Sequence, residues 1–125
     1  MLRLSEDEFA ELVDEALEGV PPQFKRYMEN LAVEIRQRPT PELLKRLKVR
    51  GGRDLLGVYH GTALPDKSVE APFEYPETIF IFQRNIEAVC DTRRDVVEQV
   101  RVTVLHEIGH HFGMDEDDLE ELGYD

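Results

Sequence analysis

Two histidines and a glutamate near the C-terminal end of the sequence have the spacing of a metal site. His106 and His110 are four residues apart, and Glu107 directly follows the first of them. On an α-helix four residues advance about 400° and rise about 6 Å, so both histidines project from one face and can hold one metal ion. Glu107 lies about 100° around the same helix. Its carboxylate can reach a water molecule beside the metal and act as general base, so the pattern H-E-x-x-H indicates hydrolysis assisted by zinc.

The helix that carries this pattern has a distinct apolar face. With His106 at zero on a helical wheel, His110 falls at about 40°, and Gln99 and Thr103 fall close to both. The apolar residues fall between about 120° and 260°. They are Val97, Val100, Val104, Leu105, Ile108 and Phe112. The histidine pair is therefore predicted to point away from the buried face, as buried core histidines would not. His111 falls at about 140°, and we interpret it as a packing residue or a support for the ligands.

A third metal ligand is needed, because catalytic zinc usually has three protein ligands and a water. The longer pattern H-E-x-x-H-x-x-G-x-x-H provides it after a glycine that lets the chain turn back. Here the glycine is Gly113 and the residue at the ligand spacing is Glu116, with Asp117 and then Asp115 as alternatives. The same acidic residues also suit the N-terminal end of a final short helix without any metal.

Length and composition limit the class of protein. A chain of 125 residues favours a single domain, residues 1–125, with one modest core. The net charge of −12 argues against nucleic acid as a partner. No apolar run approaches the roughly 18 residues of a membrane span, and the first residues lack the apolar stretch of a signal peptide. Cys90 is the only cysteine, so a reducing, cytoplasmic location is expected.

Local patterns predict the elements that position the motif. Helices are predicted from the capping box of Ser5 and Glu8 to Gly19, over 22–29 as a single turn, over 41–48 and, as a short helix, over 85–89. The motif helix is predicted from Asp91 or Thr92 to Gly113, and a final helix over 115–122. Strands are predicted over 31–36, 55–61 and 78–82. The strand over 78–82 is bulky on both faces, which predicts a central position. The glycines of the strand over 55–61 favour an edge.

The run Val102–Leu119, with the sequence VTVLHEIGHHFGMDEDDL, resembles the mini-zincins. These are small single-domain bacterial proteins regarded as candidate zinc metallopeptidases, and the resemblance is sharp over the last third of the chain. It implies an α+β, minimal zincin-like fold, in which a short mixed sheet of three to four strands packs against the motif helix. It also implies that His106 and His110 are zinc ligands and Glu107 the catalytic base. Glu116 stands at the third-ligand position, where the family pattern often has aspartate.

These features together predict a zinc-dependent metallopeptidase that hydrolyses a peptide or protein substrate. Tyr59, His60 and Tyr124 are candidate donors to the oxyanion of the reaction. An edge strand such as Leu55–His60 can hold an extended peptide by strand addition. Two alternatives stay open. One is a zincin-like protein that binds metal weakly or not at all and acts through protein contacts, and the other is an amidohydrolase with a non-peptide substrate.

Overall fold

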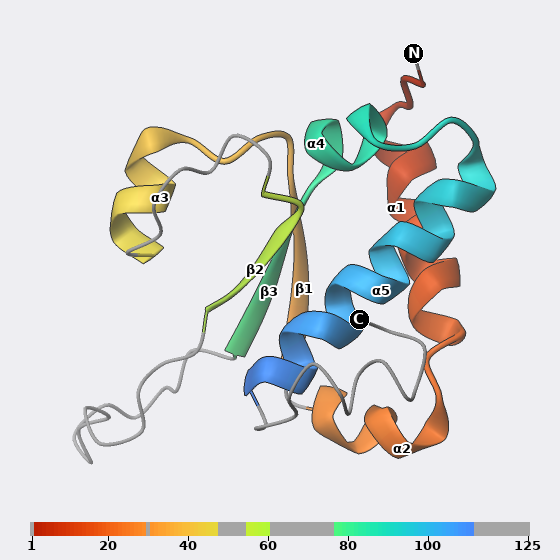
Figure 1. The fold of residues 1–125 in the computed structure, drawn as a ribbon, viewed down its shortest axis with the longest axis vertical. Helices are drawn as coiled ribbons and strands as arrows, with labels where there is room; N and C mark the ends of the chain where they lie inside the picture. The colour runs from red at the N-terminus through yellow and green to blue at the C-terminus, as the bar shows by residue number, and fades with distance from the viewer. Residues whose placement is uncertain (1, 30, 48–54, 61–76, 112–125) are drawn as a thin grey trace.

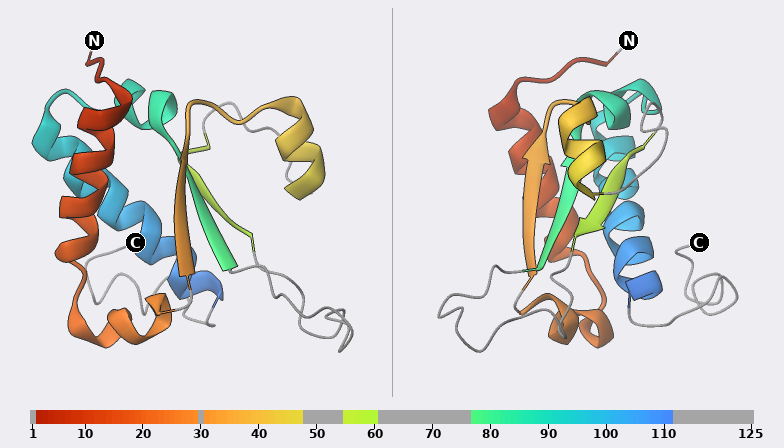
Figure 2. Two further views of the ribbon diagram at one scale, coloured as in Figure 1. Left: turned by 180° about the vertical axis from the view of Figure 1, so that it is seen from behind. Right: turned by 90° about the vertical axis from the view of Figure 1, so that its left-hand side faces the viewer.

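The computed structural model describes residues 2–29, 31–47, 55–60 and 77–111. They form, in chain order, α1 (Glu6–Glu18), α2 (Pro22–Lys25), the 3-10 helix η1 (Arg26–Met28), β1 (Leu31–Arg36), α3 (Pro41–Leu47), β2 (Gly57–His60), β3 (Glu77–Phe82), α4 (Gln83–Ala88) and α5 (Arg93–His111). α1 and α5 lie side by side on one side of the sheet, and α3 lies on the other (Figures 1 and 2). This arrangement is the α+β fold that the sequence predicted.

The sheet is mixed and has the strand order β1-β3-β2 in the described part of the chain. β3 pairs in parallel with β1 and antiparallel with β2. The central position predicted for this apolar strand is therefore confirmed, and Ile79 and Ile81 are fully buried in it. β2 is an edge strand among the described strands, as its glycines indicated.

The core lies between the sheet and the pair of helices α1 and α5. It is built from aliphatic and aromatic side chains that include Phe9, Leu12, Val13 and Ala16 of α1, Ile79 and Ile81 of β3, and Val96, Val97, Val100, Val104, Leu105 and Ile108 of α5. Burying one such large side chain contributes roughly 1.5–3 kcal/mol. This shared core fixes α5, and with it the histidine motif, against the sheet.

Both long helices begin with side-chain caps. At α1, Ser5 Oγ accepts from the Glu8 N–H at 3.1 Å and Glu8 Oε1 accepts from the Ser5 N–H at 2.9 Å, which is the predicted capping box. Ahead of α5, Thr92 Oγ1 accepts from the Asp95 N–H, and Asp95 Oδ2 accepts from the Thr92 N–H, both at 3.1 Å. Thr92 is therefore the residue that caps the motif helix.

Three elements start at residues other than the predicted ones. β3 begins at Glu77, one residue before the predicted start. β2 begins at Gly57 rather than at Leu55. The Leu55 carbonyl oxygen accepts a hydrogen bond from the side-chain amide of Asn85 in α4, at 2.6 Å. α4 begins at Gln83, two residues before the predicted start. The expectations for residues 112–125, which include the turn at Gly113 and the final helix, lie outside the described residues.

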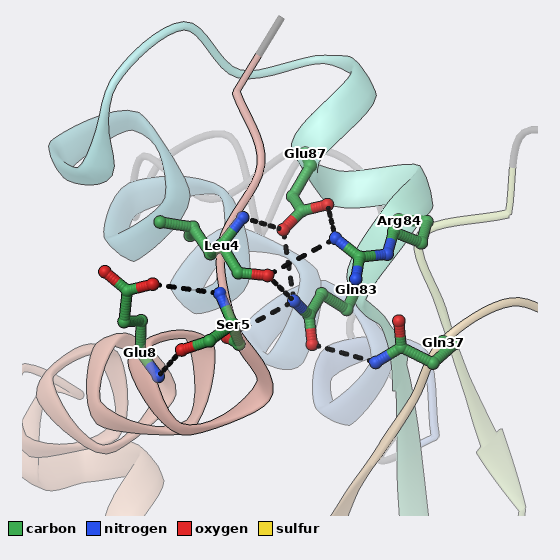
Figure 3. A network of polar contacts seen from close by, with 7 residues as sticks. All are labelled: Leu4, Ser5, Glu8, Gln37, Gln83, Arg84 and Glu87. Carbon is green, nitrogen blue, oxygen red and sulfur yellow. Dashed lines mark hydrogen bonds and ion pairs between the residues drawn. The ribbon is translucent and has the colours of Figure 1, made fainter.

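A buried polar network joins the N-terminal segment to α4 and to the residue after β1 (Figure 3). The Glu87 carboxylate accepts from the Leu4 N–H at 2.9 Å and from Arg84 Nη1 at 2.7 Å. Gln83 Nε2 donates to the Leu4 carbonyl oxygen at 3.0 Å, and Gln37 Nε2 donates to Gln83 Oε1 at 3.1 Å. The network lies at the end of the fold away from the last turn of α5 (Figure 1).

Candidate metal centre

The last turns of α5 bring His106 and His110 together. Their Nε2 atoms are 2.7 Å apart, within hydrogen-bond distance, and the tautomers decide which ring donates. The ring centroids are 4.4 Å apart and the ring planes are inclined by 51°. The two ring nitrogens therefore converge on one point beside the helix, as the spacing of four residues predicted.

The histidine pair lies on the less buried face of α5. His106 is half-buried and His110 is exposed. In contrast, Val104, Leu105 and Ile108 are fully buried in the core. The prediction that the pair points away from the apolar face of the helix is confirmed.

Gln99 and Thr103 precede the histidines on the same face of α5, and this part of the helix packs against the edge strand β2. Thr103 is buried, and it accepts a hydrogen bond from Gln99 Nε2 at 3.3 Å. A Cβ atom at Gly57 would lie 2.8 Å from Thr103 Cγ2 and 2.9 Å from the carbonyl oxygen of Phe80, too close for any side chain. Glycine at this position therefore lets β2 approach α5 directly, beside the histidine pair.

Glu107 is bonded to this edge strand. Its Oε1 accepts a hydrogen bond from the main-chain N–H of Tyr59 in β2, at 3.2 Å. Burial raises the pKa of the Glu107 carboxyl above its usual range, and this effect exceeds the opposing effects of the Tyr59 hydrogen bond and of the His106 and His110 charges. A carboxylate with a raised pKa, next to two converging imidazoles, is suited to accept a proton near neutral pH.

His111 and Tyr59 form a second aromatic pair next to the first. Their rings are stacked with centroids 3.9 Å apart and planes inclined by 19°. His111 Nε2 lies 3.7 Å from Glu77 Oε1 at the start of β3. His111 therefore packs against the sheet, as interpreted from the wheel. Neither Glu77 nor this use of the Tyr59 ring was apparent from the sequence.

The three candidate oxyanion donors differ in whether a substrate could reach them. The Tyr59 hydroxyl is buried and has no hydrogen bond of standard geometry within the described part of the chain. Burial, and then the nearby Glu77 carboxylate, raise its pKa far above the usual range. A buried hydroxyl is not accessible to a substrate in this structure. His60 is exposed at the end of β2, and Tyr124 lies outside the described residues.

A cavity of about 310 Å³ opens beside the motif, between the approach to β2 and α5. Its lining is mainly apolar and consists of Leu55, Leu56, Gly57, Gln99, Val102, Thr103, His106 and Glu107. Because His106 and Glu107 form part of its wall, a side chain bound there would lie next to the proposed reaction site.

The sequence pattern of the zincin-like metallopeptidases matches residues 28–124, most of the chain including the motif. The chain belongs to the zincin-like metallopeptidase family. A solved structure, that of a conserved hypothetical protein from Thermo thermophilus, is similar with a TM-score of 0.52 and 26% identity. The likeness covers 95% of this chain and 97% of that one. No curated protein matches the chain.

The two histidines of this zincin-like chain fit a zinc ion. Zn–N bonds of about 2.0–2.1 Å at a tetrahedral angle separate two ligand nitrogens by about 3.3–3.4 Å. The Nε2 atoms of His106 and His110 are 2.7 Å apart, so a small rotation of the rings provides the required spacing. Imidazole nitrogens are also among the preferred ligands of zinc.

The predicted third ligand cannot be placed from the described residues. Glu116, and its alternatives Asp117 and Asp115, lie in the segment 112–125 outside them. Within residues 2–29, 31–47, 55–60 and 77–111, no group of three histidine, cysteine or carboxylate side chains is arranged to hold a metal ion. The assignment of the third ligand therefore stays a prediction.

None of the helices in the described part of this zincin-like chain is both long and apolar enough to cross a membrane. The long helix α5 carries charged residues along its outer face, among them Arg93, Arg94 and Glu98. Its length of 19 residues is used in packing against α1 and the sheet.

Proposed function

We propose that this protein is a zinc-dependent metallopeptidase, in which His106 and His110 hold the metal and Glu107 is the general base. The observation that carries the proposal is the geometry of these three side chains on α5. Two imidazole nitrogens converge to 2.7 Å, and the intervening carboxylate is anchored to the edge strand beside them. Membership of the zincin-like metallopeptidase family supports the same function.

Zinc, when bound, supplies a Lewis acid that polarises the scissile carbonyl and makes a water molecule more acidic. The protein's own contribution is then the placement of proton acceptors and of substrate. Glu107 accepts the proton of the attacking water and returns it to the leaving amine. Burial shifts the pKa of the Glu107 carboxyl toward neutral pH. A group with a pKa near the working pH can both accept the proton of the water and give it to the amine.

The edge strand provides a way to hold a peptide substrate. In an antiparallel pair, a residue directs its N–H and C=O groups either to the partner strand or outward. The outward N–H of Tyr59 already donates to Glu107, so the other outward groups of β2, which lie beside the proposed base, are the ones left for a peptide. An extended peptide added along this edge would therefore place its main chain next to Glu107.

The apolar cavity beside the motif complements this edge. It is lined by Leu55, Leu56 and Val102 and borders both His106 and Glu107. We therefore expect a substrate with an apolar side chain next to the scissile bond. Cys90 is the single cysteine of the sequence, and its thiol is free and buried, which supports a reducing, cytoplasmic location within the proposal.

The proposal is tested with protein purified without chelators. Zinc content, zinc affinity and hydrolysis of casein and of a peptide library are measured for the parent, His106→Ala and Glu107→Gln. The proposal expects about one zinc per chain, peptide hydrolysis by the parent, and loss of both properties in His106→Ala. A parent without zinc would favour a role through protein contacts. Zinc binding with hydrolysis of only non-peptide amides would favour an amidohydrolase.

A further inference from the structure

Tyr59 contacts both ends of the proposed site. Its main-chain N–H donates to Glu107 Oε1 at 3.2 Å. Its ring stacks at 3.9 Å on His111, the residue that directly follows His110. One residue of the edge strand thus reaches the proposed base and the end of the helical turn that carries the second histidine.

The neighbours of Tyr59 give it a fixed position. It is paired with Ile79 of β3, which is fully buried. Tyr59 is partly buried and packs against the hydrophobic core, and its hydroxyl is buried. On the other side, His111 is held near the Glu77 carboxylate at 3.7 Å. The stack on His111 and the buried hydroxyl therefore direct the ring toward its neighbours rather than toward a substrate.

We propose that Tyr59 is a positioning residue for the proposed site: its main chain orients Glu107, and its ring, through His111, holds the last turn of α5 and so places His110. The expected effects on zinc binding and catalysis rest on the proposed function. The expected immobilisation of the last turn of α5 does not depend on it. Residues that orient metal ligands typically alter metal affinity by about 10–100-fold when they are replaced.

The chain offers matched variants. Tyr59→Phe keeps the stacked ring and removes only the hydroxyl. Tyr59→Leu keeps an apolar side chain and removes the stack. Val58→Ala is the control for general weakening of β2, because Val58 is the preceding residue and its side chain projects from the opposite face of the strand. His111→Leu removes the other member of the stack at a partly exposed position, and therefore tests the same contact if Tyr59→Leu folds poorly.

Three measurements are made on each variant: zinc affinity by chelator competition, kcat and KM on a peptide substrate, and amide hydrogen exchange of α5 in the metal-free protein. Tyr59→Leu and His111→Leu should each weaken zinc binding by about 10-fold or more. Tyr59→Leu should lower kcat with KM near the parental value. In Tyr59→Leu and in His111→Leu, the amides of the last turn of α5 should exchange faster than they do in Val58→Ala. Tyr59→Phe should resemble the parent, and a variant that combines Tyr59→Leu with His111→Leu should be no worse than the worse single variant.

Two results would overturn the inference. One is that Tyr59→Leu and His111→Leu match Val58→Ala in zinc affinity and in local exchange, which would leave Tyr59 only a packing role. The other is that Tyr59→Phe is as damaging as Tyr59→Leu, which would assign the effect to the hydroxyl. If the parent binds no zinc, the proposed function fails. Exchange in the metal-free protein still decides whether Tyr59 holds the end of α5.

Discussion

The main-chain N–H of Tyr59 donates to Oε1 of Glu107 at 3.2 Å, and this hydrogen bond joins the edge strand to the motif helix across 48 residues of sequence. It directs the Glu107 carboxylate along the strand edge. In the proposed function, a base held there would lie beside a peptide that pairs with β2, because its position is set by the same strand. The hydrogen bond would then couple the placement of the proposed base to the placement of the substrate.

The first prediction concerns the metal. His106→Ala and His110→Ala should each abolish tight zinc binding, because each removes one of the two ring nitrogens that converge to 2.7 Å. Zinc affinity is measured by chelator competition on protein prepared without chelators. His60→Ala is the matched control, since His60 is an exposed histidine of β2 and should retain the parental affinity. Equal zinc binding by all three variants would place the metal site elsewhere.

The second prediction concerns the base. Glu107→Gln should retain fold and zinc but lose peptide hydrolysis by roughly a hundredfold or more. The amide oxygen of glutamine can still accept the Tyr59 N–H, so the side chain keeps its position and only its ability to take a proton is removed. The measurement is kcat on a peptide substrate, with zinc content and thermal unfolding as controls. Parental activity in this variant would show that Glu107 has no catalytic role.

The local part of the site could be predicted from the sequence. The spacing of His106 and His110 and the apolar arc of α5 both follow from the helical period, which depends only on neighbouring residues. The caps of α1 and α5 were predicted for the same reason, although the sequence left Asp91 and Thr92 as alternatives. The structure selects Thr92, whose Oγ1 accepts the Asp95 N–H.

The long-range part of the site could not be predicted. The contacts of Tyr59 with Glu107 and His111 depend on where β2 lies against α5, and no local pattern encodes that placement. The same holds for the network around Glu87, whose partner Leu4 is 83 residues away. The glycines of the strand predicted over 55–61 did indicate an edge strand. They did not indicate which of its residues would face the motif.

The third prediction concerns the cavity beside the motif. Val102→Phe should partly fill the cavity of about 310 Å³ and discriminate against peptides with a large apolar residue next to the scissile bond. One extra or missing methylene group in such a pocket alters relative kcat/KM by about 10–200-fold. Val102→Ala enlarges the cavity and should shift preference in the opposite direction. Unchanged ratios of kcat/KM for leucine and alanine peptides in both variants would show that the cavity does not bind substrate.

The fourth prediction concerns stability in acid. Burial disfavours ionisation of Glu87, but hydrogen bonds from Gln83, Arg84 and the Leu4 N–H outweigh it, so the pKa of its carboxyl is lowered. A lowered folded pKa stabilises the fold above the unfolded value of about 4.3, and this contribution is lost as the pH falls through the folded pKa. Glu87→Gln should cost about 1–3 kcal/mol at pH 7 and make stability less dependent on pH below about 4.3.

Urea unfolding at pH 7 and at pH 3 measures both parts of this prediction. Glu11→Gln is the control, since Glu11 is an exposed glutamate of α1. The difference in unfolding free energy between parent and Glu87→Gln should shrink as the pH falls. A difference that stays constant would mean that the ionised carboxylate of Glu87 does not stabilise the fold.

The fifth prediction concerns the third metal ligand. Glu116→Ala should weaken zinc binding more than Asp117→Ala or Asp115→Ala, because Glu116 stands six residues after His110, at the ligand spacing of the extended motif. Removing a ligand should weaken zinc binding by more than the 10–100-fold that is typical of residues that only orient ligands. Zinc affinities of the three single variants, measured under one set of conditions, decide the order.

The neighbouring aspartates provide the matched controls, since each substitution removes one negative charge from the same acidic run. Equal weakening in all three variants would reveal only the loss of general electrostatic attraction. A larger effect of Asp117→Ala would show that the turn after the motif helix brings a different carboxylate back to His106 and His110.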